Sequence, residues 1–175
     1  MSTPLTLHFM LEELTRTGGH TNPDGTPIDN TPDMSMAASL LKVAEKLEEA
    51  RDIWTAKLGR DCTVRISYGY RCKALNDAVG SQDTSAHLLG LAADAIPLEL
   101  TLREAFDALV EHSDFCADVD QLIIERGCVH IGLPIPAHNN VARHELRLDV
   151  TAADGTRHYP LYGHWTPQGV EQVRS

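Results

Sequence analysis

Residues 85–94 read Ser85-Ala86-His87-Leu88-Leu89-Gly90-Leu91-Ala92-Ala93-Asp94, which places a histidine seven positions before an aspartate in an otherwise apolar segment. An unpaired carboxylate in a buried strand is costly, and a divalent cation offsets that cost. Gly90 and Ala92 are small enough to let a loop and a strand wrap tightly around an ion. The spacing therefore makes His87 and Asp94 candidate metal ligands. The alternative at this point is an exposed histidine in a loop and an aspartate that is hydrogen-bonded at a strand end.

A third candidate ligand, His130, lies in the apolar stretch Val129-His130-Ile131. In such a strand, a histidine that faces a polar site is easier to explain than one that faces the core. Three protein ligands with a fourth position open to water are typical of catalytic zinc, whereas structural zinc usually has four ligands and favours cysteine. The sequence therefore predicts one catalytic metal centre made by His87, Asp94 and His130.

The segments around these residues predict helices first and strands last. Apolar residues recur at helical spacing over 34–58, and shorter helices are expected over 8–15, 74–79 and, from a capping box at Thr101, up to residue 110. Alternating or apolar runs predict strands over 63–68, 91–96, 121–125, 128–133, 144–151 and 157–162, with a hairpin turn at Asp154-Gly155. Helices followed by an antiparallel meander indicate an α+β domain.

Length and charge narrow the class of protein. At 175 residues and 19.2 kDa, we expect one compact domain spanning residues 1–175. Fifteen Lys+Arg against 25 Asp+Glu give a net charge of −10, which argues against binding to nucleic acid or anionic lipid. The first residues lack the basic and apolar regions of a signal peptide, and no long apolar run is present, so we expect a cytoplasmic protein on synthesis without a transmembrane segment. The cysteines are expected to be buried, reduced thiols: Cys62, Cys72, Cys116 and Cys128.

Further motifs surround the candidate ligands in a fixed order. They comprise Leu5 to Leu14, Ile28-Asp29-Asn30-Thr31-Pro32, Gly69-Tyr70-Arg71, Leu75-Asn76, Val79-Gly80, Asp120 to Glu125, and Val129-His130-Ile131. The pattern Ser-x-His-x-x-Gly-x-Ala-x-Asp is met in full by Ser85, His87, Gly90, Ala92 and Asp94. In this combination the chain resembles the zinc D-Ala-D-Ala peptidases of the peptidase M15 family, in the short form found in phage lysins and bacterial cell-wall carboxypeptidases.

The resemblance implies a fold and a set of roles. The implied fold is an M15/hedgehog-like α+β arrangement, in which N-terminal helices pack on a small antiparallel sheet that holds a single zinc site. His87, Asp94 and His130 are then ligands of one Zn²⁺, Glu125 is the general base, and Arg71 stabilises developing negative charge. Ser85 and Tyr70 are implied to bind substrate.

Several positions depart from the family pattern. Cys128 stands where the family often has Trp, and strand alternation places it on the same side as His130, where it either narrows the substrate groove, approaches the metal or is simply a buried thiol. Some family branches keep an acidic residue three positions before the last ligand, where this chain has Gly127. Asp120 therefore remains an alternative to Glu125 as the base.

Two functions are compatible with these residues. The first is a zinc hydrolase of peptidoglycan stem peptides, acting as a D-Ala-D-Ala carboxypeptidase or as an endopeptidase of the endolysin type. The second is a non-catalytic, zinc-containing module that binds cell-wall peptides. The complete ligand set, together with Arg71 and a nearby acid, favours the enzyme. We expect a monomer that reaches the cell wall after release, as a phage-encoded protein would.

Four other histidines are better explained as surface residues of the C-terminal strands. His144-Glu145 resembles the start of a zincin helix, but the position four residues after His144 is Leu148 in a segment that alternates like a strand. His138 or His144 is the better candidate for the rim of the groove, whereas His158 and His164 carry no further signal.

Overall fold

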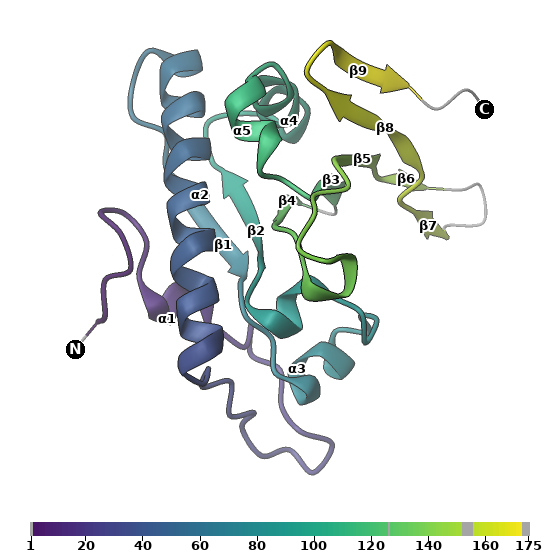
Figure 1. The fold of residues 1–175 in the computed structure, drawn as a ribbon. Coiled ribbons are helices and arrows are strands. Elements are labelled where there is room, and N and C mark those ends of the chain that lie inside the picture. The colour runs from purple at the N-terminus through teal and green to yellow at the C-terminus, as the bar shows by residue number, and fades with distance from the viewer. Residues whose placement is uncertain (1, 126, 152–155, 173–175) are drawn as a thin grey trace.

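The computed structural model describes residues 2–125, 127–151 and 156–172, and within them the fold is α+β, with a mostly antiparallel sheet (Figure 1). The helices are α1 (Leu11–Leu14), α2 (Met34–Leu58), α3 (Lys73–Ala78), α4 (Leu102–Val110) and α5 (Ser113–Ala117), with 3₁₀ turns η1 (Ala86–Leu89) and η2 (Pro136–His138). The strands are β1 (Val64–Tyr68), β2 (Ala92–Pro97), β3 (Gln121–Glu125), β4 (Cys128–Gly132), β5 (Glu145–Leu148), β6 (Val150–Thr151), β7 (Arg157–His158), β8 (Leu161–Thr166) and β9 (Gly169–Gln172).

Helix α2 spans the range that the sequence predicted. The Asp33 carboxylate accepts a hydrogen bond from the backbone N–H of Met36 (2.8 Å), which satisfies a donor that the first helical turn leaves free. The face of α2 that meets the core is apolar, and Trp54 on that face donates from Nε1 to the carbonyl of Ala105 (2.9 Å). This bond joins α2 to α4, whose predicted capping box between Thr101 and Glu104 is also present.

The large sheet has the strand order β1-β2-β4-β3-β5-β8-β9 within the described residues. The pairs from β1 to β3 are antiparallel, as predicted, and so are β5–β8 and β8–β9, but β5 runs parallel to β3, so the predicted antiparallel meander is wrong at this one pair. A parallel neighbour needs a crossover connection rather than a tight turn. The segment 133–144, which contains η2, provides that crossover and carries the chain back to the starting end of β3.

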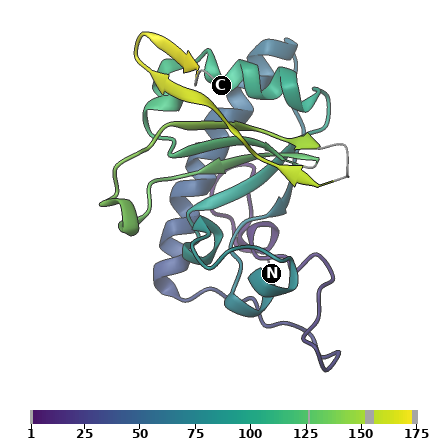
Figure 2. The ribbon, with the colours of Figure 1, turned by 90° about the vertical axis from the view of Figure 1, so that its right-hand side faces the viewer.

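Strand alternation gives the sheet two different faces. On one face Ala93, Ala95, Val129 and Ile131 are fully buried in the same core cluster as residues of α2 and α4. Figure 2 looks onto the other face, with α2 behind the sheet. That face carries the cross-strand neighbours Asp94 and His130, and it therefore holds the candidate metal ligands.

The C-terminal region differs further from expectation. Helix α5 and strand β9 were not predicted, and the two long strands expected over 144–151 and 157–162 are instead split into β5 and β6, and into β7 and β8. Strands β6 and β7 pair as an antiparallel ladder, and the predicted turn Asp154-Gly155 between them lies outside the described residues.

Two other expectations concern the whole chain. Within the part of the chain that the structure describes, no helix combines the length and apolar character needed to cross a membrane. All four cysteines are free thiols, and three are buried, but Cys72 is half-buried because it lies at the exposed start of α3. The prediction of a buried thiol is therefore wrong for Cys72.

Candidate active site

The three predicted metal ligands converge at one point on the open face of the sheet. His87 comes from η1, Asp94 from β2 and His130 from β4, and all three are at least 94% buried. The Asp94 Oδ1 atom lies 2.8 Å from His130 Nδ1 and 3.2 Å from His87 Nε2, and the two nitrogens are 3.2 Å apart. Three ligand atoms this close together from three separate elements can bind one ion.

The orientation of His87 is set by the turn that follows β1. Its Nδ1 lies 2.6 Å from the carbonyl oxygen of Gly69, which can only accept, so Nδ1 carries the proton and Nε2 presents its lone pair to the site. A side chain at position 69 would collide with the carbonyl of Leu14, and glycine alone allows this close approach. The Gly69 carbonyl therefore fixes the orientation of the His87 ring, as the outer hydrogen-bond partner of an imidazole does in metal sites.

Gly90 holds the other end of the ligand segment. It follows η1 with a φ of +64°, and a Cβ atom there would lie 2.9 Å from the carbonyl oxygen of Met36 at the start of α2. The left-handed conformation turns the chain from η1 into β2, so that His87 and Asp94 reach the same point from different directions. Glycine is therefore the residue that this tight turn favours.

Burial and mutual contact shift the pKa values of the three ligands. Burial alone would raise the pKa of Asp94, but the two adjacent imidazoles hold it below its usual range. Burial lowers the pKa of His87, whereas for His130 the hydrogen bond and charge of Asp94 outweigh burial and raise the pKa. Asp94 is thus an ionised carboxylate between two imidazoles, which is a donor set suited to a divalent cation.

Glu125 lies on β3 beside this cluster. A carboxylate oxygen of Glu125, one of Asp94 and the Cys128 sulfur lie within 4.8 Å of one another. Burial, followed by the charge of Asp94, raises the pKa of Glu125, and burial also raises the pKa of the Cys128 thiol. Cys128 is therefore a protonated, buried neighbour of the acid.

Asp120, the alternative base, is engaged elsewhere. It is 2% exposed, and its carboxylate accepts hydrogen bonds from the backbone N–H, Nε and Nη2 of Arg143, at 2.6 to 3.1 Å. Its role in the fold is to hold the segment that enters β5. This arrangement leaves Glu125 as the acid that faces the ligands.

Arg71 reaches the same cavity from the turn after β1. The residue is 8% exposed, and its guanidinium donates from Nη2 to Ser85 Oγ (3.3 Å) and lies over the ring of Tyr68, 5.5 Å from the centroid. Among the described residues, no group accepts a hydrogen bond from its buried Nε. A buried cation with an unused donor is a binding point for an anion.

Tyr70 has a different environment from the other predicted site residues. Its ring packs against the core cluster, and it is not among the residues that line the cavity. Its backbone holds the turn in place, since its N–H donates to Leu14 O (2.7 Å) and its carbonyl accepts from Asn30 Nδ2 (2.9 Å). Asn30 also accepts from the Cys72 N–H (2.7 Å), so this buried amide positions Arg71 from both sides. Asn30 belongs to a stretch that resembles the family, but its role depends on contacts with segments that are distant in the sequence.

A cavity of about 740 Å³ opens in front of the cluster. Part of its lining comes from the predicted site and the residues beside it: Arg71, Ser85, His87, Glu125 and His130. A second part comes from the crossover and the strands after it, and apart from His138 it was not predicted: Ile135, Ala137, His138, Arg143, Arg147 and Tyr159. His138 thus lies at the groove, one of the two positions considered for the rim.

His144 does not line the cavity. Its Nδ1 donates to the carbonyls of Cys116 and Val119 (3.2 and 3.1 Å), and its ring packs edge-on against Trp165. The position of Arg147 could have been predicted from the sequence. Glu145 and Arg147 alternate with the apolar Leu146 and Leu148, which places the two charged side chains on the face away from the core.

The ligand atoms fit a zinc ion. Tetrahedral zinc with bonds of about 2.0–2.2 Å to nitrogen and oxygen separates its ligand atoms by about 3.3 Å, close to the 2.8–3.2 Å found among these three. Two imidazoles and one carboxylate, beside a cavity that gives access to a fourth position, match the donor set of catalytic rather than structural zinc sites.

Comparison with known families places the chain within this class. A family model described as Peptidase M15 matches residues 7–132, which is 126 of the 175 positions. The chain therefore belongs to the peptidase M15 family, and this membership supports a metallopeptidase. A search of curated proteins gives no match. The family match ends at the last residue of β4, so it covers the three candidate ligands, Glu125 and Arg71, but not the lining residues of the cavity that follow residue 132.

Proposed function

We propose that this chain is a zinc-dependent peptidase that hydrolyses the stem peptides of peptidoglycan, with residues 1–175 acting as one catalytic domain. The observation that supports the proposal best is the convergence of His87, Asp94 and His130 beside Glu125 in a cavity. Membership of the M15 family supports both the metal and the class of substrate.

His87 Nε2, His130 Nδ1 and the Asp94 carboxylate are proposed to hold one zinc ion. When bound, zinc supplies Lewis acidity that makes a water molecule acidic and polarises the scissile carbonyl. The surrounding fold holds this centre in place, because the Gly69 carbonyl accepts a hydrogen bond from Nδ1 of His87 and because Asp94 and His130 are cross-strand partners on β2 and β4.

Glu125 is proposed as the general base. Its carboxylate lies at the ligand cluster and lines the cavity, and burial raises its pKa, which favours proton uptake. In this role it accepts a proton from the attacking water and later delivers it to the leaving amine. Asp120 is unsuited to the task because its oxygens are occupied by Arg143.

Arg71 is proposed to stabilise negative charge on the substrate. Its permanent charge and forked donors suit either a terminal carboxylate or the oxyanion that forms during attack. Ser85 accepts from Arg71 and lines the same wall, so it orients the guanidinium and offers its hydroxyl to substrate. For Tyr70, the position of the ring indicates support of the turn rather than contact with the reacting atoms.

Digestion of purified peptidoglycan, with the products identified by mass spectrometry, tests the proposal. The zinc-loaded protein should release either free D-Ala or cleaved stem peptides, which also decides between carboxypeptidase and endopeptidase activity. Glu125→Gln should keep zinc and fold but lose about 10²–10⁴-fold in rate, since an amide cannot accept the proton.

Two further variants complete the test. Glu45→Gln, which removes the same charge from an exposed position on α2, should leave the rate unchanged. Asp120→Asn should lower stability more than the rate, because it weakens the buried pair with Arg143. Unaltered turnover in Glu125→Gln would reject the role of this residue. Zinc-dependent binding of stem peptides without any product would instead identify a binding module.

A further inference from the structure

The cavity has two ends of different origin. The metal end comprises the ligands with Arg71, Ser85 and Glu125, and it lies within the family match. We define the arginine end as Gln121, Arg143, Arg147 and Tyr159, and three of these four residues follow residue 132, where the family match stops. Most of the arginine end therefore lies outside the segment that the family model matches.

A single row of cross-strand neighbours connects the two ends. Asp94 pairs with His130, His130 with Ile123, and Ile123 with Arg147, so these side chains share one face of the sheet. Arg147 is two strands away from His130, which corresponds to about 10 Å at the usual strand spacing. An extended peptide covers this distance in about three residues.

The cavity wall is cationic although the chain is acidic. Three arginines line it, Arg71, Arg143 and Arg147, against one carboxylate, Glu125, in a protein whose net charge is −10. The carboxylates that pair with the arginine end lie behind the guanidinium groups. The side chains of Asp120 and Glu145 are 3% and 13% exposed, whereas those of Arg143 and Arg147 are 32% and 30% exposed.

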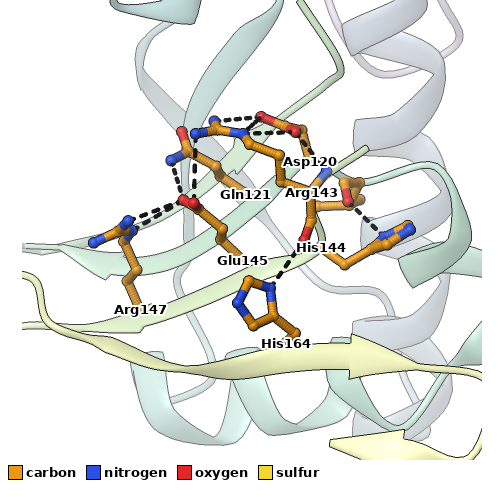
Figure 3. A network of polar contacts seen from close by, with 8 residues as sticks. Asp120, Gln121, Arg143, His144, Glu145, Arg147 and His164 are labelled. Carbon is orange, nitrogen blue, oxygen red and sulfur yellow. Dashed lines mark hydrogen bonds and ion pairs between the residues drawn. The ribbon is translucent and has the colours of Figure 1, made fainter. Parts of the chain in front are cut away.

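The guanidinium groups are held in place before any ligand arrives (Figure 3). Arg143 is bound to Asp120, and Glu145 accepts hydrogen bonds from Gln121 (2.8 Å), Arg143 (3.4 Å) and Arg147 (3.0 Å). Arg147 Nη1 also donates to the carbonyl of Tyr159 (3.0 Å). A network that fixes side chains in advance lowers the entropic cost of binding.

His138 adds an unused polar atom to the same wall. It lines the cavity from η2, and within the described residues its buried Nδ1 has no hydrogen-bond partner. A buried nitrogen of this kind is normally satisfied by a partner, which here a ligand in the cavity can supply.

From these observations we infer that the arginine end is a second anchoring subsite, which binds a carboxylate of the peptide about three residues from the bond that is cut. This inference rests on the proposed function. Carboxylate is the matching chemistry because planar guanidinium groups bind it through paired hydrogen bonds, and because peptides carry it both at the C-terminus and on acidic side chains. The subsite selects acidic peptides and fixes their position relative to the metal end.

Arg147→Gln is the variant that tests the subsite. Glu145 keeps its hydrogen bonds from Gln121 and Arg143 when Arg147 is replaced, whereas loss of Arg143 would leave the buried Asp120 uncompensated. Arg103→Gln is the matched control, since Arg103 is an exposed arginine on α4 that also pairs with a carboxylate, Asp107, but does not line the cavity. Arg147→Lys keeps the positive charge but loses the planar, forked arrangement of N–H donors.

The probes are synthetic peptides ending in D-Ala-D-Ala with one side-chain carboxylate three residues from the terminal bond. Versions amidated at the side chain or at the C-terminus separate the two sources of carboxylate. Affinity is measured by calorimetry on zinc-loaded Glu125→Gln protein, with and without the arginine substitutions, and kcat/KM is measured on zinc-loaded protein that retains Glu125. Thermal melting of every variant monitors the fold.

Amidation of one carboxylate of the peptide, either the one on the side chain or the one at the C-terminus, should weaken the affinity of the peptide for the parent protein by about tenfold to a hundredfold. The preference should vanish in Arg147→Gln, be reduced in Arg147→Lys and persist in Arg103→Gln. Equal binding of acid and amide by the parent protein, or the same preference in folded Arg147→Gln, would overturn the subsite. Binding that depends on Arg147 without cleavage would support the subsite and reject the peptidase activity. Cleavage without a preference for the carboxylate over the amide would support the peptidase activity and reject the subsite.

Discussion

The two faces of the sheet are built from the same strands but depend on different interactions. On the helix face, Ala93 and Ile131 are buried against a core that the chain completes by itself. On the cavity face, Asp94 and His130 alternate with them along β2 and β4, and they place a carboxylate between two imidazoles. Stability is therefore concentrated on one face and chemistry on the other. Substitutions on each face should have separate consequences.

The largest effect is expected from removing ligands on the cavity face. His87→Ala combined with Asp94→Ala leaves one protein ligand of three, so the zinc content of the dialysed protein should fall from one per chain to near zero, as measured by elemental analysis. His112→Ala combined with Asp114→Ala removes the same residue types from an exposed loop and helix start, and it should leave the zinc content unchanged. Full zinc content in the first double variant would show that the ion binds elsewhere.

A substitution on the helix side should change stability without changing chemistry. Leu47 is fully buried on α2, and Leu47→Ala should lower the free energy of unfolding by about 2–5 kcal/mol in a denaturant titration. Well below the melting temperature, zinc content and kcat/KM should stay at wild-type values. Leu41→Ala on the exposed side of the same helix should cost much less. If Leu47→Ala lowered zinc affinity in the folded protein, the two faces would not be independent.

Arg71→Lys tests the cavity face without touching a ligand. Lysine keeps the charge but loses the forked geometry, so kcat/KM should fall by the equivalent of about 2–4 kcal/mol while zinc content and melting temperature are retained. Arg103→Lys on α4 serves as the control. Unfolding or zinc loss in Arg71→Lys would make the residue structural, and undiminished turnover would remove it from the site.

The smallest effect concerns the core thiol Cys116 at alkaline pH. Burial raises its pKa from 9.0 to about 12, and the thiol donates to the carbonyl of Leu109 (3.3 Å). The Cys116 thiol deprotonates at lower pH in the unfolded chain than in the folded protein. The stability that the group contributes is therefore complete below pH 9 and is lost as pH rises toward 12. By pH 10 this loss lowers the free energy of unfolding by about 1 kcal/mol.

The comparison of Cys116→Ala with wild type isolates this contribution. The variant should show a smaller decrease in unfolding free energy between pH 8 and 10, and Cys72→Ala at the half-buried cysteine serves as the control. Parallel pH profiles for Cys116→Ala and wild type would contradict the expectation.

Much of the metal end was predictable from local patterns. The period of two in β2 and β4 determines which residues share a face, and an acidic residue or a histidine in an apolar strand is costly without a partner. Asp94 and His130 were identified in this way, and His87 was identified by its position seven residues before Asp94; the structure brings all three together. Glu125 and Asp120 could not be separated by pattern, because both are acids at the ends of β3. The buried contact of Asp120 with Arg143, which lies 23 positions away, distinguishes them.

The long helix, most of the strands and the three ligand candidates are predictable from local patterns, because periodicity, capping and the cost of buried charge act over short stretches of chain. The folded chain was needed to see that β5 runs parallel to β3, that the Gly69 carbonyl orients His87, and that Arg147 lies on the same row as His130. These features depend on the crossover 133–144 and on contacts between distant segments. The energy of such contacts comes from packing and hydrogen bonding in the folded protein, and it leaves no periodic signal in the sequence.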